Sequence, residues 1–176
     1  MNSLANRILV HDICLTIPPD MFDIEQKIKT REEIANLSES LKKEQKILVF
    51  TNGCFDLLHR GHIAYLREAR RMGDVLIVGL NSDSSVRRLK GPERPVKGEE
   101  ERAFLLSALE FVDYVVIFPE DDPRALLSCI RPDILVKGGD HAPENILGRE
   151  FAGKTLSLRF VEGFSTTKLI ERVKRS

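Results

Sequence analysis

The stretch Ile47-Leu-Val-Phe-Thr51, followed by Asn52-Gly-Cys-Phe-Asp-Leu-Leu-His-Arg-Gly-His62, decides the fold of this chain. Its first five residues form a short apolar run, which is typical of a strand buried on both faces of a parallel sheet. A helix is predicted from about His62 to Arg71, and Gly73 follows where that helix is expected to end. A buried strand that passes through a glycine loop into a helix indicates an α/β fold.

The same alternation of strand and helix continues along the chain. Strands are predicted at 75–80, 114–118, 134–136 and 156–160, and helices at 99–109, 124–130 and 165–174. Because parallel strands need crossover connections, this order predicts a Rossmann-like, doubly wound α/β domain with a mostly parallel five-stranded sheet and helices on both faces. Ligands of such sheets bind outside the carboxyl ends of the strands, so the loops there are the candidates for a site.

The first 46 residues precede this alternation. Residues 1–23 are predicted to be an irregular arm, because Pro18-Pro19 breaks any helix there and the apolar residues before it are too few for a core. The arm is expected to pack on the domain or to join subunits of a homodimer or higher homo-oligomer. From Ile24 to Lys46, apolar residues recur at helical spacing, which predicts a leading surface helix of the domain 24–176.

The composition is that of one globular domain without net charge. The chain has 176 residues, of which 42% are hydrophobic, and its 27 basic and 27 acidic residues balance. This length supports one core, and the balance gives no reason to expect nucleic acid or a membrane surface as a partner. Three widely spaced cysteines argue against a zinc site or a disulfide framework, and no apolar run approaches the ~20 residues of a membrane span. The protein is therefore expected to be soluble and cytoplasmic.

The loop between the first strand and its helix has the chemistry of a phosphate site. Gly53 lets the backbone approach an anion closely, and the free amides of the helix that begins after Gly61 favour negative charge. His59 and His62 bracket Gly61, so both imidazoles are able to donate N–H groups to one transferring phosphoryl group. A loop histidine is more often a surface or packing residue, but its place at the ligand end of the sheet favours the catalytic interpretation.

This segment resembles the HIGH-motif nucleotidyltransferase superfamily, whose cytidylyltransferase-like members carry Gly-x-Phe-Asp-x-x-His-x-Gly-His. The motif is matched at Gly53, Phe55, Asp56, His59, Gly61 and His62. Further segments narrow the resemblance to the heptose 1-phosphate adenylyltransferases: Asn81-Ser-Asp83, Arg88-Leu-Lys-Gly91 with Arg94-Pro-Val96, Leu135-Val-Lys-Gly-Gly-Asp140 and Ser165-Thr-Thr167. The resemblance covers about residues 30–176, and such enzymes occur alone or as the carboxyl-terminal half of a bifunctional kinase and adenylyltransferase.

The resemblance implies a reaction and its substrates. AMP would pass from ATP to D-glycero-β-D-manno-heptose 1-phosphate, which gives ADP-heptose and pyrophosphate for the synthesis of lipopolysaccharide core precursors. Mg²⁺ is expected to be bound by the triphosphate, without protein ligands.

Together with the chemistry of the residues, the resemblance assigns roles by position. Catalytic roles are expected of His59, His62 and Lys90. Nucleotide binding is expected of Thr51, Asn52, Gly53, Cys54, Phe55, His59, Gly61, His62, Lys137, Gly138, Ser165, Thr166 and Thr167. Binding of the acceptor substrate is expected of Asp56, Asn81, Lys90, Arg94, Gly139 and Asp140.

Several of these residues have a structural alternative. The segment 87–97 has five basic residues and one acid, and its Gly91, Pro92 and Pro95 predict a loop that either clamps phosphates or is merely solvated. Asp56 either orients a histidine or helps to place magnesium, or else bonds the backbone of a turn.

The glycine loop near residue 140 and the last predicted helix have alternatives too. Asp140 follows two glycines and either binds sugar hydroxyls or forms an Asx turn. His141 stands where an aromatic residue is expected from the resemblance. Ser165 either only caps the last predicted helix or also binds phosphate. Cys54 is expected to pack rather than to act as a nucleophile, because no transfer to the enzyme is required.

One sequence motif is rejected as a phosphate-binding site. Gly148-Arg-Glu-Phe-Ala-Gly-Lys-Thr155 matches the phosphate-binding loop of kinases, which needs a strand before it and a helix at its lysine. Here Leu156, Leu158 and Phe160 alternate as in a strand, so this context is missing.

Two other functions remain open from the sequence. A cytidylyltransferase would use CTP with glycerol 3-phosphate or a related alcohol phosphate and the same chemistry. A nucleotide-binding regulatory domain without turnover is the other alternative, and the presence of both histidines argues against it.

Overall fold

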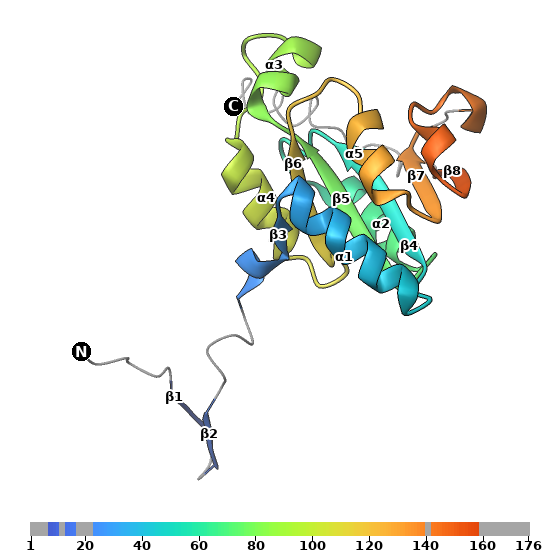
Figure 1. The fold of residues 1–176 in the computed structure, drawn as a ribbon. Coiled ribbons are helices and arrows are strands. Elements are labelled where there is room, and N and C mark those ends of the chain that lie inside the picture. Colours follow the sequence, from blue (N-terminus) through green and yellow to red (C-terminus); the bar gives the residue numbers. More distant parts are fainter. Residues whose placement is uncertain (1–6, 11–12, 17–22, 140–141, 159–176) are drawn as a thin grey trace.

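In the computed structural model, residues 7–10, 13–16, 23–139 and 142–158 are described. The centre of the fold is a six-stranded sheet in the order β3-β6-β5-β4-β7-β8, in which every neighbouring pair is parallel (Figure 1). The strands are β3 (Ile28–Lys29), β4 (Leu48–Gly53), β5 (Val75–Asn81), β6 (Tyr114–Phe118), β7 (Ile134–Gly138) and β8 (Lys154–Leu158). From β4 the chain builds outward through β5 to β6, then returns to β7 on the other side of β4. The strand order thus reverses between β4 and β7, where a ligand crevice is expected.

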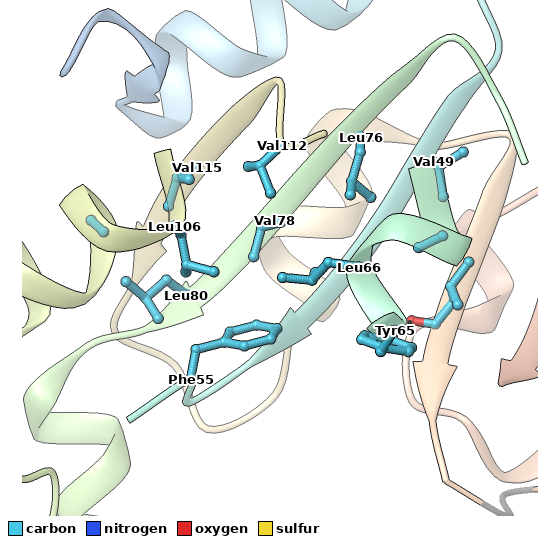
Figure 2. Close-up of a cluster of buried hydrophobic side chains, with 13 residues drawn as sticks. Val49, Phe55, Tyr65, Leu66, Leu76, Val78, Leu80, Leu106, Val112 and Val115 are labelled. Carbon is cyan, nitrogen blue, oxygen red and sulfur yellow. Dashed lines mark hydrogen bonds between the residues drawn. The ribbon is translucent and has the colours of Figure 1, made fainter. Parts of the chain in front are cut away.

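Helices cover both faces of this sheet. On one face lie α2 (Arg60–Arg70) and α4 (Glu99–Ser107), whose apolar side chains join Val49, Val78 and Leu80 in the cluster of Figure 2. On the other face lie α1 (Arg31–Lys43) and α5 (Arg124–Ile130), which pack against the alternate strand residues such as Phe50 and Ile77. The predicted doubly wound, parallel sheet with helices on both faces is confirmed.

The predicted number of strands is wrong by one, and so are the bounds of the leading helix. Residues 24–46 were expected to be one helix, but the structure has a 3₁₀ helix (Ile24–Lys27), then β3, and α1 only from Arg31. Thr30 sets the start of α1, because its side chain accepts from the Glu33 N–H while the Glu33 carboxylate accepts from the Thr30 N–H. Strand β3 pairs only Ile28 and Lys29 with β6, and two residues are too short for an alternating pattern.

The basic segment 87–97 is not a loop throughout. Its first residues belong to α3 (Asp83–Lys90), which Ser82 caps by accepting from the Ser85 N–H at 3.3 Å. The loop runs from Gly91 to Gly98 and joins α3 to α4. This short polar helix was missed because it lacks an apolar stripe: within it only Ser85 and Val86 are buried.

The amino-terminal segment has regular structure where an irregular arm was expected. Strands β1 (Arg7–Val10) and β2 (Ile13–Thr16) form an antiparallel pair that is separate from the six-stranded sheet. The division of the chain into an arm and a domain 24–176 stays a prediction.

The carboxyl-terminal elements are only partly described. The last strand expected, at 156–160, is β8 at Lys154–Leu158, preceded by 3₁₀ turns at Pro143–Asn145 and Arg149–Phe151. Because a strand begins at Lys154, no helix amides face that lysine, in line with the rejection of the kinase-type loop. The helix predicted at 165–174 lies outside the described residues.

Candidate active site

Strand β4 ends beside β7, where the strand order of the sheet reverses. Thr51 is fully buried, and its hydroxyl lies 2.5 Å from the Tyr65 hydroxyl of α2. The same Tyr65 hydroxyl donates to the carbonyl oxygen of Val136 on β7 at 3.1 Å. One side chain of α2 therefore connects both strands and fixes the helix relative to them.

The turn after β4 sets the surroundings of the His62 ring. Phe55 has φ +43°, a left-handed conformation that is costly for a bulky residue, and its side chain is buried. Its ring lies 3.1 Å from the place a Cβ of Gly53 would take, and its centroid is 5.2 Å from that of the His62 imidazole in an edge arrangement. Gly53 is thus needed to make room for a ring that forms one wall of the histidine site.

The two predicted catalytic histidines meet at the start of α2. Their rings stack with centroids 3.8 Å apart and planes 18° from parallel. His59 is the N-cap of α2, and its Nδ1 accepts from the backbone N–H of His62 at 3.4 Å. An accepting Nδ1 carries no proton, so neutral His59 carries its proton on Nε2, where it is free to donate to an anion.

His62 is held in its neutral form. Burial, with the His59 imidazole beside it, lowers the pKa of His62 to about 4, and burial also lowers the pKa of His59. The Nδ1 atom of His62 is buried and has no hydrogen-bond partner among the described residues. A buried polar atom without a partner is costly, so this site is suited to a ligand that supplies one.

Both lysines with a predicted role, Lys137 and Lys90, lie near the loop after β4. Lys137, on β7, donates its Nζ to the carbonyl and the side-chain oxygen of Asn52 at 3.3 and 3.1 Å, which links it to the end of β4. Burial lowers the pKa of Lys137, and the positive charge of Lys90 lowers it further, so Lys90 lies within electrostatic range. Burial raises the pKa of Cys54 despite these lysines, which agrees with a packing role for that thiol.

Asp56 has a structural partner in the loop after α3. Its carboxylate is buried and accepts from Arg94 Nε at 2.5 Å, from the Val96 N–H at 2.7 Å and from the Lys97 N–H at 3.1 Å. The structure thus brings Asp56 and Arg94 together as a buried ion pair that fixes the loop. A direct contact of either residue with substrate stays a prediction.

Asn81, Gly138 and Gly139 also lie at the carboxyl ends of the strands. The Asn81 side chain is buried and donates to the Ser85 hydroxyl at 3.0 Å, and its contact with substrate stays a prediction. Gly138 ends β7, and Gly139 has φ +111° and donates its N–H to the Leu158 carbonyl at 2.8 Å. The positive φ of Gly139 is one that residues with a side chain rarely adopt, so glycine is required at this position. Asp140, His141, Ser165, Thr166 and Thr167 lie outside the described residues.

Two residues at this edge were not predicted from the sequence. Tyr65 lies three positions after His62, hence on the same face of the helix, and this spacing is a signal that could have been used. Arg102 is fully buried in α4, but it directly follows three glutamates, so its place in the sequence gives no signal of burial.

The described residues give two further findings on predicted partners. Within residues 23–139 and 142–158, no three or more histidine, cysteine or acidic side chains gather in a way that could hold a metal ion. In the same part of the chain, no helix is long and apolar enough to cross a membrane. Cytoplasmic location and Mg²⁺ on the triphosphate stay predictions.

Comparison with known proteins places the chain among nucleotidyltransferase-like sequences. Residues 50–172 match the family model described as cytidylyltransferase-like. The chain is 55% identical over 155 residues to the "Bifunctional protein HldE" of Pelobacter propionicus, with 86% of this chain and 32% of the relative covered. It is 54% identical over 143 residues to the protein of the same name from Helicobacter pylori strain Shi470, with 81% and 31% covered. The chain thus spans about a third of the length of these curated relatives.

Two solved structures are similar to it. The lipopolysaccharide core biosynthesis protein from Thermoplasma volcanium GSS1 is 30% identical with a TM-score of 0.58, covering 66% of this chain and 99% of that one. The pantoate-beta-alanine ligase from Francisella tularensis has a TM-score of 0.55 at 15% identity, with 84% and 76% covered, which shows a shared fold alone.

Proposed function

Because the chain belongs to the cytidylyltransferase-like family, we propose that it is an adenylyltransferase acting on a sugar 1-phosphate. The reaction joins AMP from ATP to D-glycero-β-D-manno-heptose 1-phosphate and releases pyrophosphate, giving ADP-heptose for lipopolysaccharide core precursors. The choice of acceptor rests on the motifs at 81–83, 88–96, 135–140 and 165–167. The similarity to the lipopolysaccharide core biosynthesis protein of Thermoplasma volcanium supports the same pathway.

The observation that carries the proposal is the stacked pair His59 and His62 at the start of α2, the helix that follows β4, where the strand order reverses. In the reaction an acceptor phosphate oxygen attacks the α-phosphorus of ATP in line, and the bond to pyrophosphate breaks on the opposite side. Such a transfer needs positioning and charge neutralisation more than covalent chemistry. Neutral imidazoles that donate N–H bonds to the α-phosphoryl oxygens meet that need, and neither histidine has to change its proton count.

The remaining residues of the site hold the reactants. Lys137 and Lys90 neutralise phosphate charge near the loop after β4, while Asn52 orients the Lys137 ammonium. Mg²⁺, bound to the triphosphate, supplies further charge neutralisation when ATP is present. Asp140 and the Ser165–Thr167 segment are proposed to bind the sugar and the nucleotide phosphates. A cytoplasmic homodimer or higher homo-oligomer is part of the proposal.

Pyrophosphate release tests both substrate and site. The native chain and His62→Ala are assayed with ATP and with CTP, each with heptose 1-phosphate and with glycerol 3-phosphate, and thermal unfolding confirms that both proteins are folded. Release with ATP and the heptose that collapses in His62→Ala is the expected result. Release only with CTP would keep the site and overturn the nucleotide and acceptor, and nucleotide binding without release from any mixture would favour a regulatory domain.

A further inference from the structure

Arg102 is the largest fully buried side chain of the described residues, and it is charged. Its guanidinium donates to four oxygens: to Cys54 O at 2.6 Å and Asn81 O at 2.9 Å through Nη1, to Lys97 O at 2.9 Å through Nε, and to Asp83 Oδ1 at 2.7 Å through Nη2. Three of these acceptors are backbone carbonyls, so the contact fixes the course of the chain.

The acceptors belong to the segments that carry the proposed site. Cys54 is in the loop between β4 and the histidines, and Asn81 is the last residue of β5. Asp83 begins α3, the helix that ends with Lys90, and Lys97 is in the loop 91–98. One side chain from α4 thus joins the histidine loop, the end of β5, the start of α3 and the basic loop.

The loop 91–98 is fixed from two sides. The N–H of Lys97 donates to the buried carboxylate of Asp56, and the carbonyl of the same residue accepts from Arg102. Asp56 is in the histidine loop and Arg102 is in α4, so two opposite buried charges hold one residue of the basic loop between them. The loop is therefore held in register with the histidine loop, although Pro92, Glu93 and Val96 are exposed.

Stability alone does not account for this arginine. A guanidinium loses its hydration on burial, and apolar residues of similar volume at such positions are often as stable or more so. A planar group with five donors is instead well suited to fix several carbonyls in one geometry.

We propose that Arg102 is a positioning residue for nucleotidyl transfer, which holds the loop of His59 and His62 and the loop 91–98 in register without touching the substrates. This inference rests on the proposed function, because it assigns Arg102 to the reaction of the same site.

The test compares Arg102→Met, Arg102→Ala and, as a matched control, Arg70→Ala. Arg70 is an ion-paired arginine bonded to Asp113 at 2.9 Å, and it lies near the opposite ends of the strands. Arg102→Met fills most of the volume and is expected to stay folded, with kcat for pyrophosphate release roughly 10²-fold lower, as for a displacement of about 1 Å at a site of this kind. Arg70→Ala is expected to keep the kcat of the native chain.

Chemical rescue separates positioning from a general structural role. Arg102→Ala leaves a cavity that methylguanidinium at millimolar concentration fills, so its kcat is expected to rise with added methylguanidinium and to saturate. Arg102→Met, whose cavity is filled, and Arg70→Ala should not respond. Native kcat in folded Arg102→Met would overturn the proposal, and so would a folded Arg102→Ala that methylguanidinium does not rescue.

Two further outcomes are decisive. If neither variant folds, Arg102→Lys is measured, because a single ammonium cannot reach acceptors on all sides; unchanged kcat in that variant overturns the inference. If the native chain itself releases no pyrophosphate, the proposed function fails, and this is distinct from a native chain that is active and indifferent to Arg102.

Discussion

The two ends of the parallel strands are built in opposite ways. At the amino ends, aspartate side chains accept hydrogen bonds from backbone N–H groups. Asp74 accepts from the Ile47 N–H at 2.8 Å, Asp133 from the Leu48 N–H at 2.8 Å and Asp113 from the Leu76 N–H at 2.7 Å. At the carboxyl ends, Asp56 and Arg102 are bonded within the chain, but the buried Nδ1 of His62 has no partner among the described residues. The amino edge therefore bonds strand amides through its aspartates, whereas the carboxyl edge keeps one buried polar atom that a ligand is suited to satisfy. Substitutions at the two edges should therefore affect different measurements.

The largest expected effect is on activity and comes from the histidine pair. His62→Ala should lower kcat for pyrophosphate release about 10²–10³-fold, as for the loss of one donor to a transition state, with little change in the urea midpoint. Because the two rings stack and act on one phosphoryl group, His59→Ala with His62→Ala should lose much less than the product of the single effects. Multiplicative losses would indicate that the histidines act independently.

The second effect is on stability and depends on pH. Unfolded His62 titrates near 6.5 and folded His62 near 4, so the unfolded chain binds the proton first as the pH falls. The contribution of His62 to the free energy of unfolding is fully present above about pH 6.5 and is lost as the pH falls toward 4. Between pH 7.5 and pH 5, the loss from this one residue is about 2 kcal/mol. Urea unfolding at these two pH values should show a smaller difference in His62→Gln than in the native chain. An equal difference in both proteins would mean that folded His62 titrates normally.

A third effect is on nucleotide affinity. Lys137→Met should raise the KM for ATP about tenfold, equal to about 1.4 kcal/mol, because a charged donor to phosphate is lost. The free energy of unfolding should stay level or rise, because burial of the ammonium is no longer needed. Lys154→Met, an exposed lysine at the amino end of the neighbouring strand, is the matched control and should change neither value. A similar KM in both variants would remove Lys137 from the nucleotide site.

The smallest effect is expected at the amino edge. Asp113→Ala removes the acceptor for the Leu76 N–H and the ion pair with Arg70, so the free energy of unfolding should fall by about 1 kcal/mol. The kcat should be unchanged, and Asp113→Asn, which keeps one acceptor oxygen, should recover part of the stability. A loss of kcat at full stability would show that the two edges are not separate in function.

The sequence carried more information about strands and motifs than about the polar connections between them. Buried strands such as β4 and β5 are continuous apolar runs, and the glycine and histidine positions are local, so both could be predicted. Strand β3 and helix α3 could not, because a two-residue strand and a polar helix leave no periodic pattern. Asp56 and Lys97 are 41 residues apart and Arg102 and Cys54 are 48 apart, so only the tertiary fold decides that these groups meet.

The double contact of Tyr65 also sets an order of assembly for the site. Its hydroxyl meets Thr51, 14 residues before it, and Val136, 71 residues after it, and Lys137 meets Asn52 across 85 residues. These contacts therefore join segments that are far apart in the chain. On the ribosome, the histidine loop and α2 emerge long before β7, so the proposed site cannot be complete until translation has passed Lys137.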